Sequence, residues 1–221
     1  MKILFGYVFT YIYIFSILFL IDILKKKFKC SEETSRKLIH ILVSLSWIIM
    51  FYCFENTWHL MIPPITFVIL NYISYKKDLF SMMERKDKSK NSFGTVYYPM
   101  SMVVLSICSM VDKRFLLPCG IGMFCMAFGD GLAPYFGQKF KSYAFKLLGN
   151  SKTLFGSLTV FICSLIVAII FSLLFNLNFG ISEILLISLC STIFELIGIK
   201  GLDNIILPIG VAIVSYIFII I

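Results

Sequence analysis

Apolar runs recur from one end of the chain to the other, and each spans about 17 to 25 residues, enough to cross a hydrocarbon core of about 30 Å. Of the 221 residues, 59% are hydrophobic and 14% are charged, whereas a soluble domain carries about a quarter charged residues. In lipid only helices and closed barrels satisfy the backbone, and continuous apolar runs without alternation favour helices. The sequence therefore predicts an all-α, polytopic membrane helix bundle.

We expect one integral membrane domain over residues 1–221, with about eight transmembrane helices. The first run has no small-residue cleavage site after it, so we interpret it as a span and not as a signal peptide. The seven cysteines are scattered without a CxxC pair, which indicates small core residues. The expected helices cover 3–24, 38–54, 58–75, 95–111, 115–136, 153–175, 180–199 and 203–221.

The basic residues are divided unequally between the two sides of this bundle. Of the 20 lysines and arginines, all but Lys2, Lys113 and Arg114 fall in the connections on one side. Cytoplasmic connections are rich in lysine and arginine, so these connections are expected to face the cytoplasm and both termini to face outward. We expect an integral protein of a prokaryotic cell membrane, whose net charge of +8 attracts anionic lipid. Nucleic acid is not an expected partner, because no separate basic domain exists.

Three acidic residues fall at the cytoplasmic ends of the expected helices. Asp130 stands between two glycines in AFGDGLAPYFGQKF, Glu195 precedes the end of its helix, and Asp203 lies in KGLDN. Carboxylates are ligands that suit Mg²⁺, so Asp130 and Asp203 are candidate metal ligands. Asp130 or Glu195 could instead act as the catalytic base. A structural alternative places Asp130 in a salt bridge with Lys139 or Arg36.

The segment SRKLIH brings three further candidates to the same side. Arg36 and Lys37 precede His40 by four and three residues, which places all three on one helical face. Pairs with Glu32 and Glu33 would explain the two cations as anchors of an interfacial helix, but they would not explain His40. We therefore include His40 among the candidate catalytic residues.

The segment GNSKT is expected to open the sixth helix. Backbone donors, Lys152 and the hydroxyl of Thr153 at a helix N-terminus make a plausible phosphate site, although Ser151 could simply cap the helix. Carboxylates and many cations at a lipid interface suit phosphoryl transfer, in which charge neutralisation does most of the catalytic work. The candidate nucleotide- and phosphate-binding residues are Arg36, Lys37, Lys139, Lys152, Thr153, Lys200 and Asn204.

These residues lie in segments that resemble a known family. SRKLIH, GTVYYPMS, FGDGLAPYFGQKF, NSKTLFGS and FELIGIKGLDN occur in the order seen in the diacylglycerol/polyprenol kinase family, and the resemblance covers residues 31–210. That family includes dolichol kinase and phytol kinase and is related to phosphatidate cytidylyltransferase. The resemblance implies CTP or another nucleoside triphosphate as donor, Mg²⁺ as cofactor, and a membrane lipid alcohol (an isoprenoid alcohol or diacylglycerol) as acceptor.

The resemblance also implies roles for single residues. Asp130 and Asp203 would be metal- or phosphate-site acids, Lys152 and Lys200 would contact phosphates, and the SRKLIH residues would line the site. The chain departs from the family pattern at Phe155, where the family commonly has Glu, and at Gln138, where it often has Arg. These two departures allow three interpretations: the acid and the cation are lost together as a neutralised pair, the phosphate donor differs, or the activity is weaker.

Two other functions remain as alternatives. A phosphatidate cytidylyltransferase would use the same residue types, with a lipid phosphate attacking the α-phosphorus of CTP. The short chain and the KGLDN turn favour the kinase. A non-catalytic transporter or scaffold is the third reading, and Phe155 is the feature that supports it. Transporters commonly show inverted repeats and charges near the midplane, whereas here the acids lie toward one face.

Overall fold

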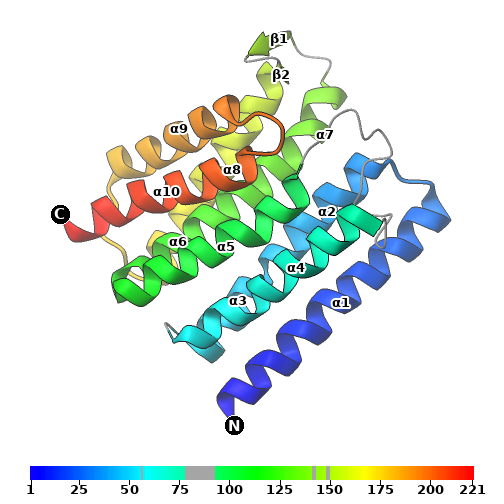
Figure 1. The fold of residues 1–221 in the computed structure, drawn as a ribbon. Coiled ribbons are helices and arrows are strands. Elements are labelled where there is room, and N and C mark those ends of the chain that lie inside the picture. Colours follow the sequence, from blue (N-terminus) through cyan, green and yellow to red (C-terminus); the bar gives the residue numbers. More distant parts are fainter. Residues whose placement is uncertain (56, 78–92, 141–142, 148–149) are drawn as a thin grey trace.

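The structure is a computed structural model that describes residues 1–55, 57–77, 93–140, 143–147 and 150–221. Its long helices run along a common direction and form a bundle (Figure 1). The helices are α1 (Lys2–Phe28), α2 (Glu32–Ser44), α3 (Ser46–Phe54), α4 (Ile62–Lys77), α5 (Gly94–Val111), α6 (Leu116–Phe124), α7 (Gly131–Lys139), α8 (Leu154–Leu174), α9 (Ile181–Ile197) and α10 (Asp203–Ile220). Short 3₁₀ turns cover Trp58–Met61 and Lys113–Phe115, and a π-helix, Cys125–Asp130, joins α6 to α7.

Six helical stretches of the described chain are long and apolar enough to cross a membrane. They are Lys2–Phe28, Glu32–Phe54, Gly94–Val111, Lys113–Lys139, Leu154–Leu174 and Asp203–Ile220. The other two expected spans correspond to α4 and α9, which are 16 and 17 residues long and are not among the six. The bundle is thus that of an all-helical membrane protein, and the count of eight spans stays a prediction.

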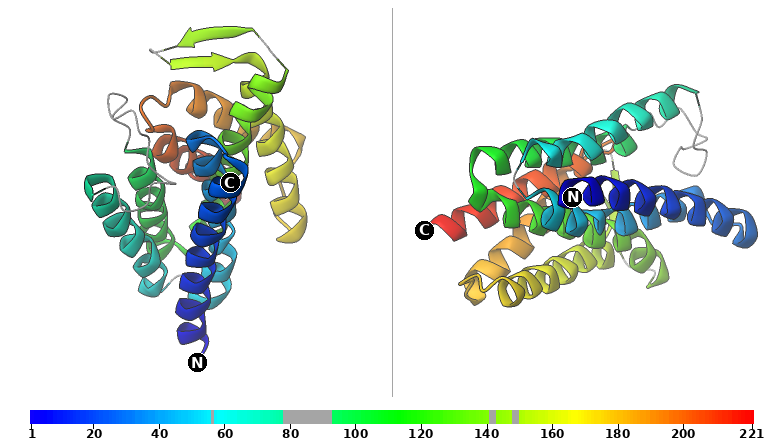
Figure 2. Two further views of the ribbon diagram at one scale, coloured as in Figure 1. Left: turned by 90° about the vertical axis from the view of Figure 1, so that its right-hand side faces the viewer. Right: turned by 90° about the horizontal axis from the view of Figure 1, so that it is seen from below.

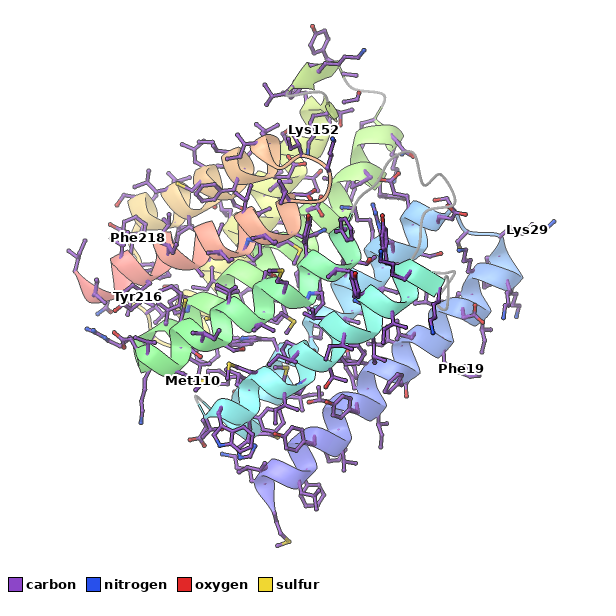
Figure 3. All side chains as sticks on the ribbon, viewed as in Figure 1. Phe19, Lys29, Met110, Lys152, Tyr216 and Phe218 are labelled. Atoms are coloured by element: carbon purple, nitrogen blue, oxygen red, sulfur yellow. The ribbon has the colours of Figure 1, made fainter. Side chains whose placement is uncertain are left out.

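The two chain ends lie at one end of the bundle. Figure 1 places the N- and C-termini on separate edges of the same end of the bundle, opposite to the start of α8. Figure 3 shows Lys29 and Lys152 at that other end of the bundle, whereas Met110 and Tyr216 lie near the termini. The described parts of the connections that the sequence analysis assigned to the cytoplasmic side therefore lie at one end of the molecule, while Arg85, Lys86, Lys88, Lys90 and Lys141 lie outside the described residues.

One element departs from the expected all-α fold. Strands β1 (Ala144–Leu147) and β2 (Asn150–Thr153) form an antiparallel hairpin in which Phe145 pairs with Lys152. A polar strand of four residues carries no apolar alternation that would reveal it in the sequence. Consequently Lys152 lies on a strand that leads into α8, and not on the helix itself.

The centre of the bundle is the stretch formed by α6 and the π-helix. Ile121, Cys125, Met126 and Ala127 are fully enclosed, and this stretch packs against α8 and α10. By contrast α1 lies at the edge of the bundle, and Figure 3 shows Phe19 pointing away from it. Large apolar side chains on such an outer face are expected where lipid takes the place of water. The packed centre thereby fixes the position of Asp130, the last residue of the π-helix.

Candidate functional site

A polar cavity of about 360 Å³ opens where the ends of α2, α7, α9 and α10 meet the β2–α8 junction. It gathers segments that are far apart in the sequence, because every one of them reaches the same end of the bundle (Figure 1). The candidate residues that line it are Arg36, Lys37, His40, Asp130, Lys152, Thr153, Glu195, Lys200, Asp203 and Asn204.

Asp130 reaches this cavity because its neighbours are glycines. A β-carbon at Gly131 would stand 2.6 Å from Ile41 Cγ1, and one at Gly129 would stand 3.2 Å from a Val160 methyl carbon. The glycines therefore allow α2 and α8 to approach the π-helix closely. As a result Lys37 of α2 donates a hydrogen bond to Asp130, with 2.5 Å between Nζ and Oδ2. The Asp130 residue is only 4% exposed.

A second ion pair joins the hairpin to α9. Lys152 Nζ donates to Glu195 Oε1 and also to the Glu195 backbone oxygen at 3.0 Å. Burial is the largest influence on the pKa of Lys152 and lowers it, but the Coulombic attraction and the hydrogen bond of Glu195 outweigh burial and raise the pKa above its ordinary value. Lys152 is therefore a cation at neutral pH. The Glu195 Oε2 atom is buried and has no hydrogen-bond partner among the described residues.

The turn before α10 supplies the next residues. Lys200 and Gly201 both have positive φ angles, 51° and 89°, and Gly201 adopts this conformation without the steric cost that a side chain would add. This tight turn places Asp203 at the first position of α10, beside the cavity. Asn204 has a structural contact, because its Nδ2 donates to the Gly94 backbone oxygen at 3.2 Å and so ties α10 to the start of α5.

The start of α8 is capped by Thr153. Its hydroxyl oxygen accepts a hydrogen bond from the Gly156 backbone nitrogen at 3.1 Å, so the cap is Thr153 and not Ser151. The cavity also contains polar residues that the sequence analysis did not select: Glu33, Gln138, Ser151 and Ser157. Each of these four residues stands within six positions of a candidate residue, and this proximity in the sequence was the signal that could have identified them.

His40 lies at the inner end of the cavity. Its residue is 4% exposed, and its ring stacks on Tyr98 with 4.6 Å between the ring centroids. Neither ring nitrogen has a hydrogen-bond partner among the described residues. A buried imidazole with both nitrogens unengaged is unusual, since buried polar atoms are nearly always paired.

Two residues singled out in the sequence lie elsewhere. Lys139 is exposed on α7, where its Nζ lies 5.6 Å from the Tyr135 ring centroid, and it does not line the cavity. Phe155 stacks on Phe140 with 5.1 Å between centroids and is likewise absent from the lining. Of the two departures from the family pattern, Gln138 is therefore the one that the cavity contains.

The charged side chains around the cavity are balanced in sign. Four are basic and four are acidic, namely Arg36, Lys37, Lys152 and Lys200, and Glu33, Asp130, Glu195 and Asp203. Within the described ranges, no three His, Cys, Asp or Glu side chains converge as a ready-made metal cluster. Asp130 and Asp203 lie near enough to repel each other electrostatically. Two carboxylates fit the protein share of a magnesium site, in which substrate phosphates and water provide the remaining ligands.

The comparisons with known proteins give one similar sequence that covers most of the chain. A phytol kinase from Synechocystis sp. is 24% identical over 209 residues, which cover 92% of this chain and 87% of the relative. No family model and no solved structure matches the chain. The similarity to this phytol kinase supports a place for this chain in the phytol/polyprenol kinase-like family.

Proposed function

We propose that this protein is a lipid kinase that transfers the γ-phosphate of CTP, or of another nucleoside triphosphate, to the hydroxyl of an isoprenoid alcohol. The observation that carries the proposal is the polar cavity at one end of a membrane-spanning bundle, where buried cations and carboxylates meet. A soluble phosphate donor and a lipid hydroxyl can reach such a place together. The similarity to a phytol kinase supports the same reaction class.

The residues that line the cavity can be assigned separate roles in this reaction. Lys37, Lys152 and Lys200 supply positive charge for the phosphate oxygens. Asp130 and Asp203 would hold Mg²⁺, which would supply positive charge against the negative charge that develops on the phosphate oxygens. Arg36, Thr153 and Asn204 complete the lining on the phosphate side.

The chemical step transfers one phosphoryl group. The lipid hydroxyl oxygen forms a bond to the γ-phosphorus, the bond from that phosphorus to the β–γ bridging oxygen breaks, and a nucleoside diphosphate leaves. The hydroxyl proton needs an acceptor within hydrogen-bond reach. His40 suits this role because both of its ring nitrogens are unengaged, whereas Asp130 bonds Lys37 and Glu195 has only Oε2 free of Lys152.

We place the cavity on the cytoplasmic side, with eight helical passes and both termini outside. The supporting observation is that Lys29 and Lys152 lie at the same end of the bundle, opposite to the termini (Figure 3). Cytoplasmic ends of spans carry most of the lysine and arginine. Nucleoside triphosphates are also supplied on that side.

Positional labelling tests the proposed reaction. Purified protein in detergent with Mg²⁺ would be offered γ-³²P-CTP or α-³²P-CTP together with phytol, farnesol, undecaprenol, diacylglycerol or phosphatidate. Label that reaches a lipid alcohol from the γ position alone is the expected result. Transfer from the α position to phosphatidate would establish a cytidylyltransferase instead. No transfer in either arm, with ATP and GTP also tried, would refute catalysis.

The replacement Phe155→Glu is expected to leave the transfer rate within about twofold of the wild type, since surface changes away from special contacts shift stability little. The reason is that the ring stacks on Phe140 outside the cavity. Initial rates and the KM for CTP would be measured beside Phe155→Leu, which removes the aromatic stacking without adding charge. Loss of activity in the Glu variant alone would show that position 155 acts on the bound nucleotide.

A further inference from the structure

A second cavity lies deeper in the bundle, beside the polar one. It has a volume of about 40 Å³ and lies between α1, the α2–α3 segment, α4 and α5. Figure 2 (left) shows α4 and α5 on one side and α1 to α3 on the other. The walls are mainly apolar and include Leu18, Val43, Phe67 and Met102. His40 lines both cavities, so the polar and apolar spaces meet at its ring.

Three buried polar side chains in the apolar cavity lack a hydrogen-bond partner among the described residues. They are His40 at both ring nitrogens, Ser46 at Oγ and Thr95 at Oγ1. Ser46 is fully buried, and His40 and Thr95 are each 4% exposed. Because unpaired polar atoms in such surroundings are costly, they indicate a ligand with a hydroxyl group and an apolar body.

We propose that this second cavity receives the hydroxyl-bearing end of a single-chain isoprenoid alcohol and directs its hydroxyl to His40. This inference rests on the proposed kinase function and adds where the acceptor binds and why an acceptor with two chains is excluded. The hydroxyl points through the junction into the polar cavity, where the phosphate donor binds. The remainder of the chain lies beyond the cavity, among lipid-facing helices.

The size of the second cavity favours a ligand with a single hydrocarbon chain. A water molecule needs about 10–15 Å³ of such volume, so 40 Å³ admits a short segment of one chain and not a branch point with two chains. In diacylglycerol two ester-linked chains branch within one or two bonds of the carbon that carries the hydroxyl. An isoprenoid alcohol carries one chain with small methyl branches and fits the narrow apolar walls.

The first test fills the cavity. The variant Val43→Phe places a ring where the first isoprene unit would lie, and Val8→Phe, on the lipid-exposed face of α1, makes the same change elsewhere. We expect Val43→Phe to raise the KM for geranylgeraniol by at least about tenfold, since a misfit of one methylene already has that effect and a ring is larger, with the KM for CTP unchanged. Val8→Phe is expected to change neither constant. Equal KM values for the alcohol in both variants would overturn the inference.

The second test uses the wild-type protein and so does not depend on a variant that folds. A prenyl alcohol carrying a diazirine in its first isoprene unit would be photolysed with the protein, and the labelled residues mapped by mass spectrometry. Labels on Phe67 and Met102 are the expected result, and labels confined to outward residues such as Phe19 would overturn the inference. Faster transfer to diacylglycerol than to prenyl alcohols would overturn it too, while leaving a kinase in place. Absence of transfer to every lipid would instead refute the proposed function.

Discussion

Asp130→Asn should reduce phosphate transfer by at least about two orders of magnitude, the usual effect of losing one strong electrostatic contact in an active site. The carboxylate lies at the centre of the polar cavity and bonds Lys37 at 2.5 Å. Its amide replacement keeps the shape but cannot hold a divalent cation as a charged ligand. The measurement is the initial rate of γ-phosphate transfer per folded protein, with folding judged by elution from a sizing column.

A matched control separates this role from the loss of any Lys–Asp pair. Asp22 and Lys26 form a pair of the same length, 2.5 Å, on α1, a helix that contributes no residue to the cavity lining. Asp22→Asn is therefore expected to retain the wild-type rate. Full activity of Asp130→Asn would remove this carboxylate from the site and with it the proposed metal position.

Lys152→Met should both destabilise the protein and abolish transfer. Removal of one partner from a buried ion pair costs about 3–5 kcal/mol, because the other charge is left unpaired. The side chains of Lys152 and Glu195 are 15% and 5% exposed, so Glu195 would remain buried without its cation. Thermal unfolding in detergent is expected to show a lower Tm, and the labelling assay no product.

The double variant Lys152→Met/Glu195→Gln distinguishes structure from chemistry. It removes the unpaired charge, so much of the lost Tm should return while transfer stays absent. Recovery of activity along with stability would show that the pair only holds the hairpin to α9. Lys146→Met, an exposed position on strand β1 of the same hairpin, is the control and should change neither quantity.

The sequence was most informative about the helices. The range expected at 95–111 matches Gly94–Val111, and that expected at 153–175 matches Leu154–Leu174. Both boundaries follow from local chemistry, namely the length of an apolar run and the residues that end it. The interfacial helix considered for the segment before residue 38 is present, since α2 begins at Glu32 and Ser31 caps it by accepting a hydrogen bond from the Thr34 backbone nitrogen.

The partners of the charged residues could not be predicted in the same way. Glu33 stands four residues before Lys37 and was the local candidate for its partner, yet Lys37 bonds Asp130, which is 93 residues away. That contact exists because Gly131 allows α2 to pack directly on the π-helix. Helix packing of this kind depends on three-dimensional complementarity, which a periodic pattern does not encode.

Lys139 is a candidate residue that the structure places outside the cavity. It was selected because it belongs to a basic segment after Asp130, but α7 continues to Lys139 and turns it outward, with its Nζ over the Tyr135 ring. The hairpin was missed as well, and it determines where Lys152 lies. Residue type predicted which side chains line the cavity more reliably than it predicted the direction in which each one points.

The equal number of acidic and basic side chains around the polar cavity has a consequence for selectivity among soluble ions. Lys37 and Lys152 already hold carboxylates in place of phosphate, so each pair acts as a built-in counter-ion. A bare anion that displaced a carboxylate would leave that carboxylate buried and unpaired, and a bare cation would do the same to a lysine. A ligand that brings both signs at once, such as a phosphate chain with its divalent cation, offers an anion to each lysine and a cation to the carboxylates, so no buried charge is left unpaired. Charge pairing alone is thus expected to give the cavity a preference for complexes over free ions.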